Sequence, residues 1–575
     1  MKKSIIILLV LSILGTIIVL FPYSVNSTHG VVNVIDPLFY AWNISHNAYN
    51  MFGGIDQLLN TNIFFPLTNT LAFSDTLWAQ SIVTTPIIWL TDNPIFAENI
   101  AVLISFPLSA LFMFLLSLYL TKNNIASILS GLFFAFSYPR LSQIGHLPMI
   151  WNQWLPLYIL YLLKFLKEGK KINFIFLCIW YLLAISSSIY FGVFLIPITG
   201  TVLIWDFITR MQNHTLAVYK NRFLETIPTL FIFLILLVAL NFPYVRLKAE
   251  HPELKRSIDD MTHLRATPKD YMSVLPTSLL APLLPNSINE HVFYPTCSVI
   301  FLALLGFILS KKQNKNVLFL WIILGTVSLV LSFGDQQAFS LGSFSTGTLR
   351  LPYYYLYTYI PLFQTVRVPA RLGIFVILSL CILAAYGIDS LKNHKGYRYI
   401  IGAFFCIFII EIWQFQTAFV SIPLKHSVPE VYSWITQLPK NTVIAELPVS
   451  LFYHGIKMED QLYTPYNALQ KSHTYALETY RVYYSSFHKK RMINGYGGYL
   501  PDSYNKLTAN LENFPSEDTV QNLSNTGVTH VIVHSLQYPE HEWSILKNKA
   551  ESHKNLRFII QFGSDYVYEV IGHKE

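Results

Sequence analysis

Charged residues are scarce in this chain. Of its 575 residues, 13% are Asp, Glu, Lys or Arg, whereas 53% are hydrophobic. Soluble globular proteins carry about 25% charged residues, and the mean hydropathy here is +0.43. This composition excludes a soluble protein with a single anchor and predicts a protein that crosses a membrane many times.

Cysteine is also rare. The four cysteines, Cys178, Cys297, Cys381 and Cys406, all lie in or at the edge of apolar segments. A disulfide framework in a loop is therefore excluded, and the cysteines say nothing about the redox compartment.

The sequence lacks a glycine-rich phosphate-binding loop and an internal repeat. Without such a loop, and with only short loops expected in the cytoplasm, an ATP-driven pump is not indicated. The net charge of +8 raises the question of a nucleic-acid partner. However, Lys and Arg occur in short runs between apolar segments, as they do where they set membrane orientation. We therefore expect no nucleic-acid partner.

Long apolar runs are what the chain has in abundance. About 20 apolar residues are needed to cross a bilayer, and eleven runs qualify. They lie near residues 4–21, 97–121, 124–138, 149–163, 172–188, 190–208, 225–241, 295–310, 317–333, 369–388 and 399–418. The first resembles a signal peptide, but no small-residue cleavage site follows it, so it is predicted to remain as a span.

The distribution of positive charge sets the predicted orientation. Lys2 and Lys3 place the N-terminus in the cytoplasm, and residues 22–75 contain no Lys or Arg. A twelfth run, residues 77–92, is short and contains Pro86. If this run does not cross, every short basic loop faces the cytoplasm, as is usual; if it crossed, all of them would face outward. We therefore predict that it forms an interfacial or re-entrant helix.

Residues 421–575 lack long apolar runs. The segments "NTVIAELPV", "THVIVHS", "RFIIQF" and "DYVYEVI" are typical of strands, whereas "DSYNKLTANLENF" and "SEDTVQNLSNT" are typical of helices. The predicted fold is mainly α: a bundle of about 11 spans over residues 1–420, followed by an extracytoplasmic α/β domain over residues 421–575. The long outer loops of the bundle are predicted at residues 22–96, 242–294 and 334–368.

The first outer loop holds the acids Asp36, Asp56 and Asp75. A carboxylate at the membrane surface can take a proton from an acceptor hydroxyl, or bind a metal that holds a phosphate. Asp56 follows "GGI" and is expected in a turn, so Asp36 and Asp75 are the candidate catalytic residues. The alternative is that each caps a turn or helix, and Asp36-Pro37 fits a helix N-cap followed by proline.

The segment "SYPRLSQIGHLPMIWNQWLP" supplies two further candidates. Polar residues at membrane depth are usually functional. Arg140 is a candidate ligand of a lipid phosphate, and His146 is a candidate metal ligand or proton carrier. The alternative for both is anchoring at the membrane interface.

The segment "LRLPYYYLYTYIPLFQTVRVPARLGIF" supplies cations beside a run of tyrosines. Arg367 and Arg371 are four residues apart, which on a helix places both guanidiniums on one face, as phosphate recognition requires. Tyr355 is a candidate to stack on a sugar or to line a polyprenyl groove. The alternative is an aromatic belt with arginines that reach the interface.

The segment "YYSSFHKKRMINGYGGYLPDSY" crowds aromatic residues, glycines and His488 near the C-terminus. It contains no Ser-His-Asp arrangement, and "GYGG" is not a phosphate loop. We interpret it as a candidate ledge for an acceptor.

Four stretches carry a family resemblance: "DPLFYAW", "NIFFPLTNTLAFSD", "FAFSYPRLSQIGHL" and "LFQTVRVPARLG". They resemble a large group of bacterial membrane proteins related to the GT-C glycosyltransferases, a class that includes the protein O-mannosyltransferases and the lipid A aminoarabinose transferase. The resemblance covers about residues 1–420. It implies that a sugar leaves a polyprenyl phosphate on the outer face, and that one or two acids in the first outer loop, flanked by membrane-surface helices, take part.

By position, the resemblance makes Asp36 the first of these acids and Asp75 the best match for the second. The loop holds no adjacent pair of acids, so the resemblance leaves dependence on a divalent metal open. We expect no other cofactor.

The sequence therefore predicts an enzyme of the bacterial inner membrane, with a cytoplasmic N-terminus and an extracytoplasmic C-terminal domain. It would transfer a sugar from a polyprenyl-phosphate donor to a glycan, lipid or protein acceptor of the cell envelope, in contact with membrane lipid. The main alternative is a transporter or flippase of a lipid-linked glycan, which the intramembrane acid Glu411 supports. A non-catalytic membrane scaffold is a third interpretation.

Overall fold

The computed structural model describes residues 1–212, 218–254, 256, 258–287, 291–341, 344–449 and 470–572. The chain forms two compact units, each built from three segments. Unit 1 comprises Met1–Val25, Ala101–Asn241 and Lys255–Thr417, and unit 2 comprises Asn26–Ile100, Phe242–Leu254 and Ala418–Glu575. The division into a transmembrane domain and a soluble domain at residues 420 and 421 stays a prediction.

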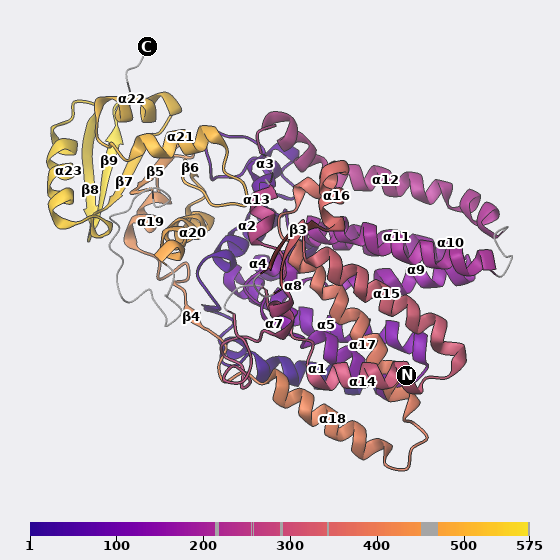
Figure 1. Ribbon diagram of the computed structural model, residues 1–575. Coiled ribbons are helices and arrows are strands. Elements are labelled where there is room, and N and C mark those ends of the chain that lie inside the picture. The colour runs from indigo at the N-terminus through magenta and orange to yellow at the C-terminus, as the bar shows by residue number, and fades with distance from the viewer. Residues whose placement is uncertain are drawn as a thin grey trace. The chain divides into compact units, whose positions relative to one another are not determined.

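A helix is present at each of the eleven predicted spans (Figure 1). These helices are α1 (Lys2–Val19), α5 (Pro94–Thr121), α6 (Asn124–Ala135), α9 (Trp154–Glu168), α10 (Lys171–Ser187), α11 (Ile189–Gln212), α12 (Val218–Glu250), α14 (Cys297–Leu309), α15 (Lys315–Ser332), α17 (Gly373–Ser390) and α18 (Tyr397–Ile412). Six segments of the described chain are long and apolar enough to cross a membrane; they lie in α1, α5, α11, α12, α15 and in Pro369–Ser390. The chain is thus a mainly helical, multi-pass membrane protein, and the count of eleven stays a prediction.

Helix α17 is the most deeply packed of these apolar segments, with 89% of its span buried, against 11% for the span in α12. It packs against α6, α14 and α15. A Cβ atom on Gly387 would lie 1.9 Å from the carbonyl oxygen of Leu302, and one on Gly306 would lie 2.3 Å from that of Leu383. Only glycine allows this approach of α14 to α17. Such close packing is how helices associate in lipid, where burying apolar surface gives no advantage.

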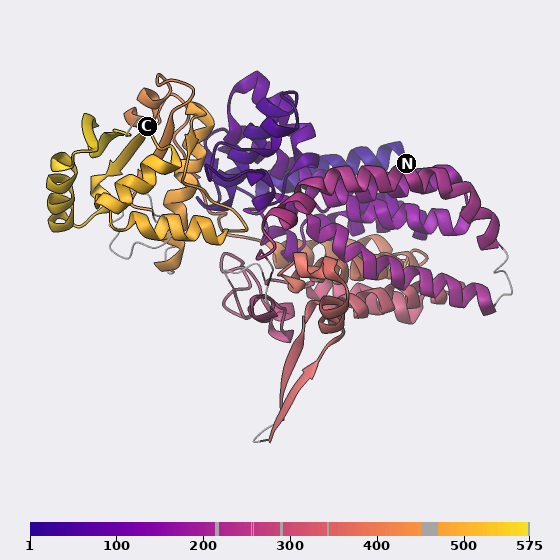
Figure 2. The ribbon, with the colours of Figure 1, turned by 90° about the horizontal axis from the view of Figure 1, so that it is seen from above.

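Shorter elements connect the helices of unit 1. They are η1 (Tyr23–Val25), α7 (Tyr138–Leu141), α8 (Leu147–Ile150), α13 (Ile258–His263), η3 (Pro268–Met272), η4 (Lys312–Asn314), β2 (Gln336–Leu341), β3 (Phe344–Arg350), α16 (Pro352–Tyr359), η5 (Pro361–Thr365) and η6 (Pro369–Leu372). Strands β2 and β3 pair in an antiparallel hairpin that projects away from the helices of this unit (Figure 2).

Unit 2 begins with the segment predicted as the first outer loop. This segment folds into β1 (Gly30–Val31), α2 (Asp36–Asn50), α3 (Ile55–Leu59), η2 (Thr70–Phe73) and α4 (Trp78–Thr91). Helix α4 occupies the run at residues 77–92, and its placement at the membrane surface stays a prediction. Strand β1 pairs with β4 (Val420–Ser421), and α2 packs against α4 and against α20 (Gln470–His488).

A five-stranded mixed sheet lies in the C-terminal part of unit 2, in the order β6-β5-β7-β9-β8 (Figure 1). The strands are β5 (Val443–Leu447), β6 (Arg491–Met492), β7 (His530–His534), β8 (Leu556–Phe562) and β9 (Asp565–Val570). The four segments predicted as strands are β5, β7, β8 and β9. Strand β5 is parallel to β6 and β7, while β9 is antiparallel to β7 and β8.

The remaining elements of unit 2 are α19 (Glu430–Ile435), α21 (Asp502–Leu511), α22 (Glu517–Thr526), η8 (Ser535–Gln537) and α23 (Glu540–Ser552). Ser516, the first residue of the segment "SEDTVQNLSNT" predicted as a helix, caps α22, because its side chain accepts a hydrogen bond from the backbone N–H of Thr519 at 3.3 Å. One hydrophobic core joins alternate residues of the sheet to α21, α22 and α23; it includes Ala445, Leu447, Val531, Val533, Leu511, Val520, Leu523, Leu546 and Ala550. Because side chains alternate along a strand, Glu446 and His534 belong to the opposite face of the sheet.

Candidate active site

Asp36 is the first residue of α2, where "DP" opens a helix with proline in its first turn. The helix starts at Asp36 itself and Ile35 is the N-cap residue, one position earlier than the predicted cap. The half-buried carboxylate of Asp36 accepts a hydrogen bond from the hydroxyl of Tyr496 at 3.0 Å. The N-terminus of a helix also favours a negative charge, so this position is suited to an acid that acts as a general base.

Tyr496 belongs to "INGYGGY", within the predicted acceptor ledge. Its ring packs edge-on against Phe39 of α2, with centroids 5.3 Å apart. Gly495 is required beside it, because a Cβ atom there would lie 2.6 Å from the ring of Phe64. The segment is therefore held against the start of α2, which brings the ledge and Asp36 together.

Asp75 follows η2, and its backbone is held by amide side chains of α2. Asn43 donates a hydrogen bond to the carbonyl oxygen of Asp75 at 3.1 Å, and Asn47 donates one to that of Thr76 at 2.9 Å. Asn43 lies seven residues after Asp36, which is about 10 Å along the helix axis. Both predicted acids are thus organised by α2, with Asp36 at its N-terminus and Asp75 beside its third turn.

Tyr244 of α12 fixes the same turn from the other side. Its hydroxyl donates to the carbonyl oxygen of Ser74 at 3.2 Å and accepts from the N–H of Thr76 at 3.0 Å. The two residues that flank Asp75 are therefore bonded to one phenol. This places Tyr244, which the sequence patterns did not single out, among the residues that position the acid.

A metal site is not visible in this arrangement. Within the described ranges of the chain, no three His, Cys, Asp or Glu side chains gather in a way that could hold a metal ion. We therefore derive no step through a metal.

Arg140 lies in unit 1 and is fully buried. Each of its five N–H groups has an acceptor: the Ala135 carbonyl, the Ile150 carbonyl, the Asn152 side chain, and the carbonyl and hydroxyl of Ser105. No donor is left for a phosphate. The structure thus gives Arg140 a role in joining α5, α6 and the turn before α9, and it does not support the predicted phosphate contact.

His146 precedes the short helix α8 and is half-buried. Its backbone carbonyl accepts from the N–H groups of Met149 and Ile150 at 2.9 and 3.0 Å. Nearby Trp151 is 1% exposed, and its indole N–H donates to the carbonyl oxygen of Ala101. The segment is thus a packed turn, and the roles predicted for His146 stay predictions.

The side chain of Arg371 and the backbone of Arg367 both contact Tyr190 in unit 1, but the two arginines do not lie on one helix. The guanidinium of Arg371 lies 4.5 Å from the ring centroid of Tyr190, and the backbone N–H of Arg367 donates to the Tyr190 hydroxyl at 3.2 Å. The predicted helix face is wrong: a 3₁₀ turn starts only at Pro369 and α17 at Gly373. The cause is the proline, because a residue before proline is kept out of helical conformation.

Tyr355 lies on α16 and is 51% exposed, with its ring edge-on to that of Tyr354. The hydroxyl of Tyr354 accepts a hydrogen bond from Arg350. Tyr355 therefore presents a free aromatic face, as stacking on a ligand requires, and its predicted role stays a prediction.

Unit 1 also contains an apolar cavity of about 1000 Å³ among α9, α10, α11 and α12. Its wall is mostly aliphatic and aromatic, with few polar groups. Two of these polar groups are the hydroxyls of Tyr158 and Thr199, which are bonded to each other at 2.6 Å. Such a wall suits a hydrocarbon chain rather than a sugar.

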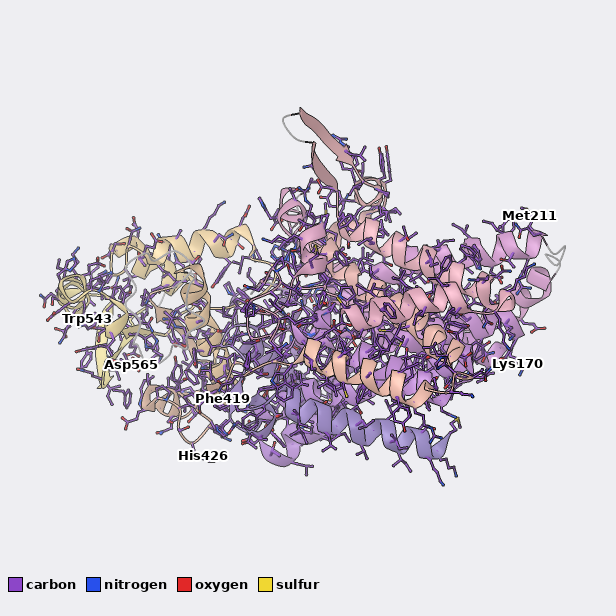
Figure 3. The ribbon with its side chains drawn as sticks, turned by 60° about the horizontal axis from the view of Figure 1, so that its bottom comes forward. Lys170, Met211, Phe419, His426, Trp543 and Asp565 are labelled. Atoms are coloured by element: carbon purple, nitrogen blue, oxygen red, sulfur yellow. The ribbon has the colours of Figure 1, made fainter. Side chains whose placement is uncertain are left out.

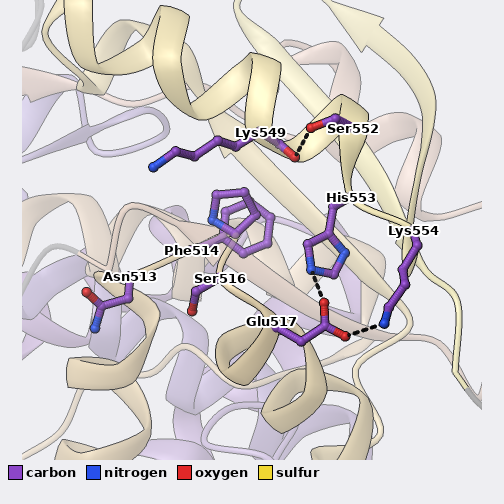
Figure 4. Close-up of a pocket in the computed structure, with 9 residues that line it drawn as sticks. Asn513, Phe514, Ser516, Glu517, Lys549, Ser552, His553 and Lys554 are labelled. Atoms are coloured by element: carbon purple, nitrogen blue, oxygen red, sulfur yellow. Dashed lines mark hydrogen bonds and ion pairs between the residues drawn. The ribbon is translucent and has the colours of Figure 1, made fainter.

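A hollow of about 450 Å³ lies in unit 2 between the start of α22 and the end of α23 (Figure 4). Its acid, Glu517, points toward His553 and Lys554, at 3.3 and 3.0 Å. This acid is already neutralised by its neighbours, so we assign the hollow no part in the candidate site.

Glu411, near the end of α18, caps the N-terminus of α14. Its buried carboxylate accepts hydrogen bonds from the backbone N–H groups of Cys297 at 2.6 Å and Ser298 at 3.1 Å. It also accepts from the hydroxyls of Ser298 and Tyr294. A carboxylate at a helix N-terminus satisfies unpaired donors. This structural role accounts for the intramembrane acid without ion transport.

Replacing Glu411 with alanine is expected to lower the free energy of unfolding by about 1–3 kcal/mol, because two N–H groups lose their acceptor in a buried place. Thermal unfolding of the purified chain in detergent would measure this. Glu430→Ala, at an exposed site, is the control and should have little effect. Unchanged stability together with lost biological activity would contradict the capping role.

A buried cluster of charges lies on the face of the sheet opposite the hydrophobic core. The carboxylate of Glu446 accepts from Nε2 of His534 at 3.0 Å and from the hydroxyl of Tyr432 at 2.7 Å, and Nε of Arg481 lies 3.6 Å away. Arg481 also pairs with the buried acid Glu478 at 2.6 Å. The ends of β5 and β7 are thereby joined to α19 and α20.

Burial and ion pairing shift the pKa values of Glu446 and His534 in opposite directions. Burial alone would raise the pKa of Glu446, but the hydrogen bond and charge of His534, with Arg481, hold that pKa below its ordinary value. Burial would lower the pKa of His534, yet its hydrogen bonds to Asp565, labelled in Figure 3, and to Glu446 raise it. Both shifts favour the ion pair between the Glu446 carboxylate and the His534 imidazolium.

Solved structures match the chain over nearly its whole length, although no family model and no curated protein matches its sequence. The arabinofuranosyltransferase AftD from Mycobacteria is 10% identical with a TM-score of 0.52, and the match covers 98% of this chain and 41% of that chain. ArnT from Cupriavidus metallidurans is 11% identical with a TM-score of 0.47, over 99% and 98% of the two chains. The archaeal oligosaccharyltransferase AglB from Archaeoglobus fulgidus is 10% identical with a TM-score of 0.47, over 98% and 74%.

All three are GT-C glycosyltransferases. The likeness to AftD is a likeness of fold. The resemblance to the GT-C glycosyltransferases that the sequence predicted is thereby confirmed, at the level of the fold.

Proposed function

We propose that this chain is a membrane glycosyltransferase that moves a sugar from a polyprenyl-phosphate donor to an acceptor of the cell envelope, on the extracytoplasmic face of a bacterial inner membrane. The observation that carries the proposal is the half-buried carboxylate of Asp36, held by Tyr496 at the N-terminus of α2 in a chain with the GT-C fold. The carboxylate fits a general base better than a simple cap, because it is bonded to a side chain of a distant segment.

The chemical step needs three changes. Asp36 takes the proton of the acceptor hydroxyl, and the acceptor oxygen then bonds to the anomeric carbon of the donor sugar. The bond between that carbon and the phosphate oxygen breaks, so the phosphate leaves with its electron pair and stays on the lipid. Asp75, positioned beside α2 by Asn43 and Tyr244, is the second candidate acid.

The donor side of the proposal rests on unit 1. Charge grows on the departing phosphate, where fixed cations help most. The guanidinium of Arg371 lies over the ring of Tyr190, and the backbone of Arg367 is bonded to the hydroxyl of the same residue, so Arg371 and Arg367 are the cations that we propose for this role. The apolar cavity among α9 to α12 suits the polyprenyl chain. An ArnT structure holds undecaprenyl phosphate and the AglB structure a dolichol-phosphate, which are lipids of the class that we propose.

Replacing Arg371 with glutamine is expected to slow transfer by about 100-fold, because one preorganised charge opposite the leaving group is lost. The rate and the KM for the lipid-linked donor, measured with the purified chain in detergent, check this. Arg350→Gln removes an exposed arginine of the same segment and should leave both constants unchanged. A rate and donor KM in Arg371→Gln equal to those of the wild type would remove this residue from the mechanism.

The function itself is tested by comparing, by mass spectrometry, the envelope glycans and lipid-linked sugars of cells with and without the protein. We expect the deletion to lose one sugar from a product and to accumulate the lipid-linked donor. Lipid extract from the deletion strain then serves as the donor source for the purified chain, and transfer in that mixture establishes an enzyme. Accumulated donor that the purified chain does not consume would contradict the proposal and favour a flippase or a scaffold.

A further inference from the structure

A second polar cavity, of about 550 Å³, lies wholly in unit 2 and is not part of the candidate active site described above. It is bounded by α2, by the segment from Gln57 to Thr68, and by the end of α20 with the start of β6. Three aromatic residues line it: Trp42, Tyr49 and Phe65. Aromatic faces beside amides and hydroxyls are the surfaces on which sugar rings bind, because one side is apolar and the edge can donate and accept hydrogen bonds.

The wall of this cavity is fixed by internal hydrogen bonds. The indole N–H of Trp42 donates to Oδ1 of Asn62 at 3.0 Å, and Nδ2 of Asn62 donates to the carbonyl oxygen of Ser485 at 3.3 Å. The ring of His46 stacks on that of Trp42, with centroids 5.9 Å apart and planes 27° apart, and Nε2 of His46 lies 3.0 Å from the carbonyl oxygen of Leu58. A ligand therefore meets a prepared surface and does not have to order it.

The cavity is positively charged. No Asp or Glu is among its lining residues, whereas the Lys489 ammonium lies 3.6 Å from the ring centroid of Tyr49, and the Arg491 guanidinium lies 4.8 Å from that of Phe65. Burial lowers the pKa of His46 to about 4, although the hydrogen bond from its ring to the backbone carbonyl of Leu58 acts in the opposite direction. The imidazole is thus neutral near pH 7, and the charge comes from Lys489 and Arg491.

Asp92, an acid bonded to one of the lining residues, is already engaged. Asp92 accepts a hydrogen bond from the hydroxyl of Tyr49 at 2.6 Å and is paired with Lys425. Inside the cavity, the hydroxyl of Ser486 is buried without a hydrogen-bond partner among the described residues. The hydroxyl of Ser486, which has no partner among the described residues, and the two cations over aromatic rings suit an anionic ligand that also carries hydroxyl groups.

We propose that this cavity binds a saccharide that carries an acidic group, either a uronate or a sugar phosphate. The sugar ring stacks on the aromatic wall, its hydroxyls meet the amides and Ser486, and its anion meets Lys489 and Arg491. Resting on the proposed function, the bound saccharide belongs to the acceptor glycan. The binding itself does not depend on that function.

Isothermal titration calorimetry of the purified full-length chain in detergent tests the proposal with four probes: trigalacturonate, its full methyl ester, glucose 6-phosphate and inorganic phosphate. We expect trigalacturonate or glucose 6-phosphate to bind at least about tenfold more tightly than both the methyl ester and inorganic phosphate, since only an acidic sugar combines hydrogen bonds to the charged groups with stacking on the aromatic wall. The tighter of the two acidic probes identifies the anion as carboxylate or phosphate. The proposal would be overturned if neither trigalacturonate nor glucose 6-phosphate bound more tightly than both the methyl ester and inorganic phosphate.

Two variants locate the binding. The double variant Lys489→Gln with Arg491→Gln should bind the acidic sugar about tenfold or more weakly than the wild type, and its affinity for the methyl ester should be unchanged. Lys506→Gln, an exposed lysine of α21, is the control and should bind as the wild type does. Undiminished binding in the double variant would place the site elsewhere.

This test is separate from that of the proposed function. If the chain binds an acidic sugar but transfers no sugar, the binding site is supported and the proposed glycosyltransferase activity is contradicted. If the chain transfers a sugar but binds no acidic sugar, the activity is supported and the binding site is contradicted.

Discussion

Replacing Asp36 with asparagine is expected to slow sugar transfer by about 10²–10⁴-fold, the usual contribution of a positioned general base. Asparagine keeps the size of the side chain, and its carbonyl oxygen can still accept the hydrogen bond from Tyr496 that the carboxylate accepts at 3.0 Å. The variant should therefore fold and insert as the wild type does while losing the group that takes the proton. Initial rates with the purified chain, its lipid-linked donor and its acceptor measure the loss.

Asp56→Asn is the matched control for that experiment. Asp56 lies in the same segment, but its side chain is 81% exposed and its nearest cation, Arg246, is 4.0 Å away. We expect transfer by Asp56→Asn within about twofold of the wild type, as for most changes at exposed sites. If Asp36→Asn transferred sugar at the wild-type rate, Asp36 would be an entry to α2 and nothing more, and Asp75 would remain as the candidate base.

Replacing Arg481 with methionine is expected to lower the free energy of unfolding by about 3–5 kcal/mol, the cost of breaking a buried ion pair by removing one partner. Methionine approximates the length of the arginine stem but leaves Glu446 and Glu478, both 0% exposed, without their shared cation. Thermal unfolding in detergent, followed by circular dichroism, measures the change. Arg557→Met removes an exposed arginine that pairs with Glu569 at the edge of the sheet, and should cost less than about 1 kcal/mol.

The wild-type cluster should also give the unfolding temperature a particular dependence on pH. The lowered pKa of Glu446 contributes stability above its ordinary value of 4.5, and this is lost as pH falls through the folded-state value below it. The raised pKa of His534 contributes stability below 6.5, which is lost as pH rises through the folded-state value above it. Both contributions are complete only between about pH 4.5 and 6.5. A wild-type stability that rises steadily from pH 6.5 to 9, or an Arg481→Met variant as stable as Arg557→Met, would contradict this account of the cluster.

The local parts of the fold could be predicted from the sequence because their causes are local. Apolar length located a helix at every predicted span, and short runs rich in β-branched and aromatic residues located β5, β7, β8 and β9. Ser516 was identifiable as a cap from its own neighbours. The break before α17 is equally local, since Pro369 prevents the residue before it from being helical, and giving that proline full weight would have corrected the expected helix face of Arg367 and Arg371.

The environment of the candidate site was not predictable in the same way. Arg140 is polar in the sequence whether it faces a phosphate or, as here, five protein acceptors, and only the fold distinguishes these cases. Tyr496 lies 460 residues from Asp36, so no spacing rule connects them. One wall of the acidic-sugar cavity could be recognised in the sequence, since Trp42, His46 and Tyr49 share one face of a helix. Nothing in the sequence shows that Lys489 would lie beside them.

The interleaving of unit 2 has a consequence for how the protein is made. Gly30 pairs with Ser421, and Asp36 is bonded to Tyr496, so the N-terminal part of this unit is synthesised long before its partners. At about 5–20 residues per second, the nascent chain carries α2 without its later partner α20 for on the order of tens of seconds. During that time most of the membrane helices are being made and inserted. A nascent chain cut short before residue 418 would thus lack the partner of that face of α2 which packs against α20.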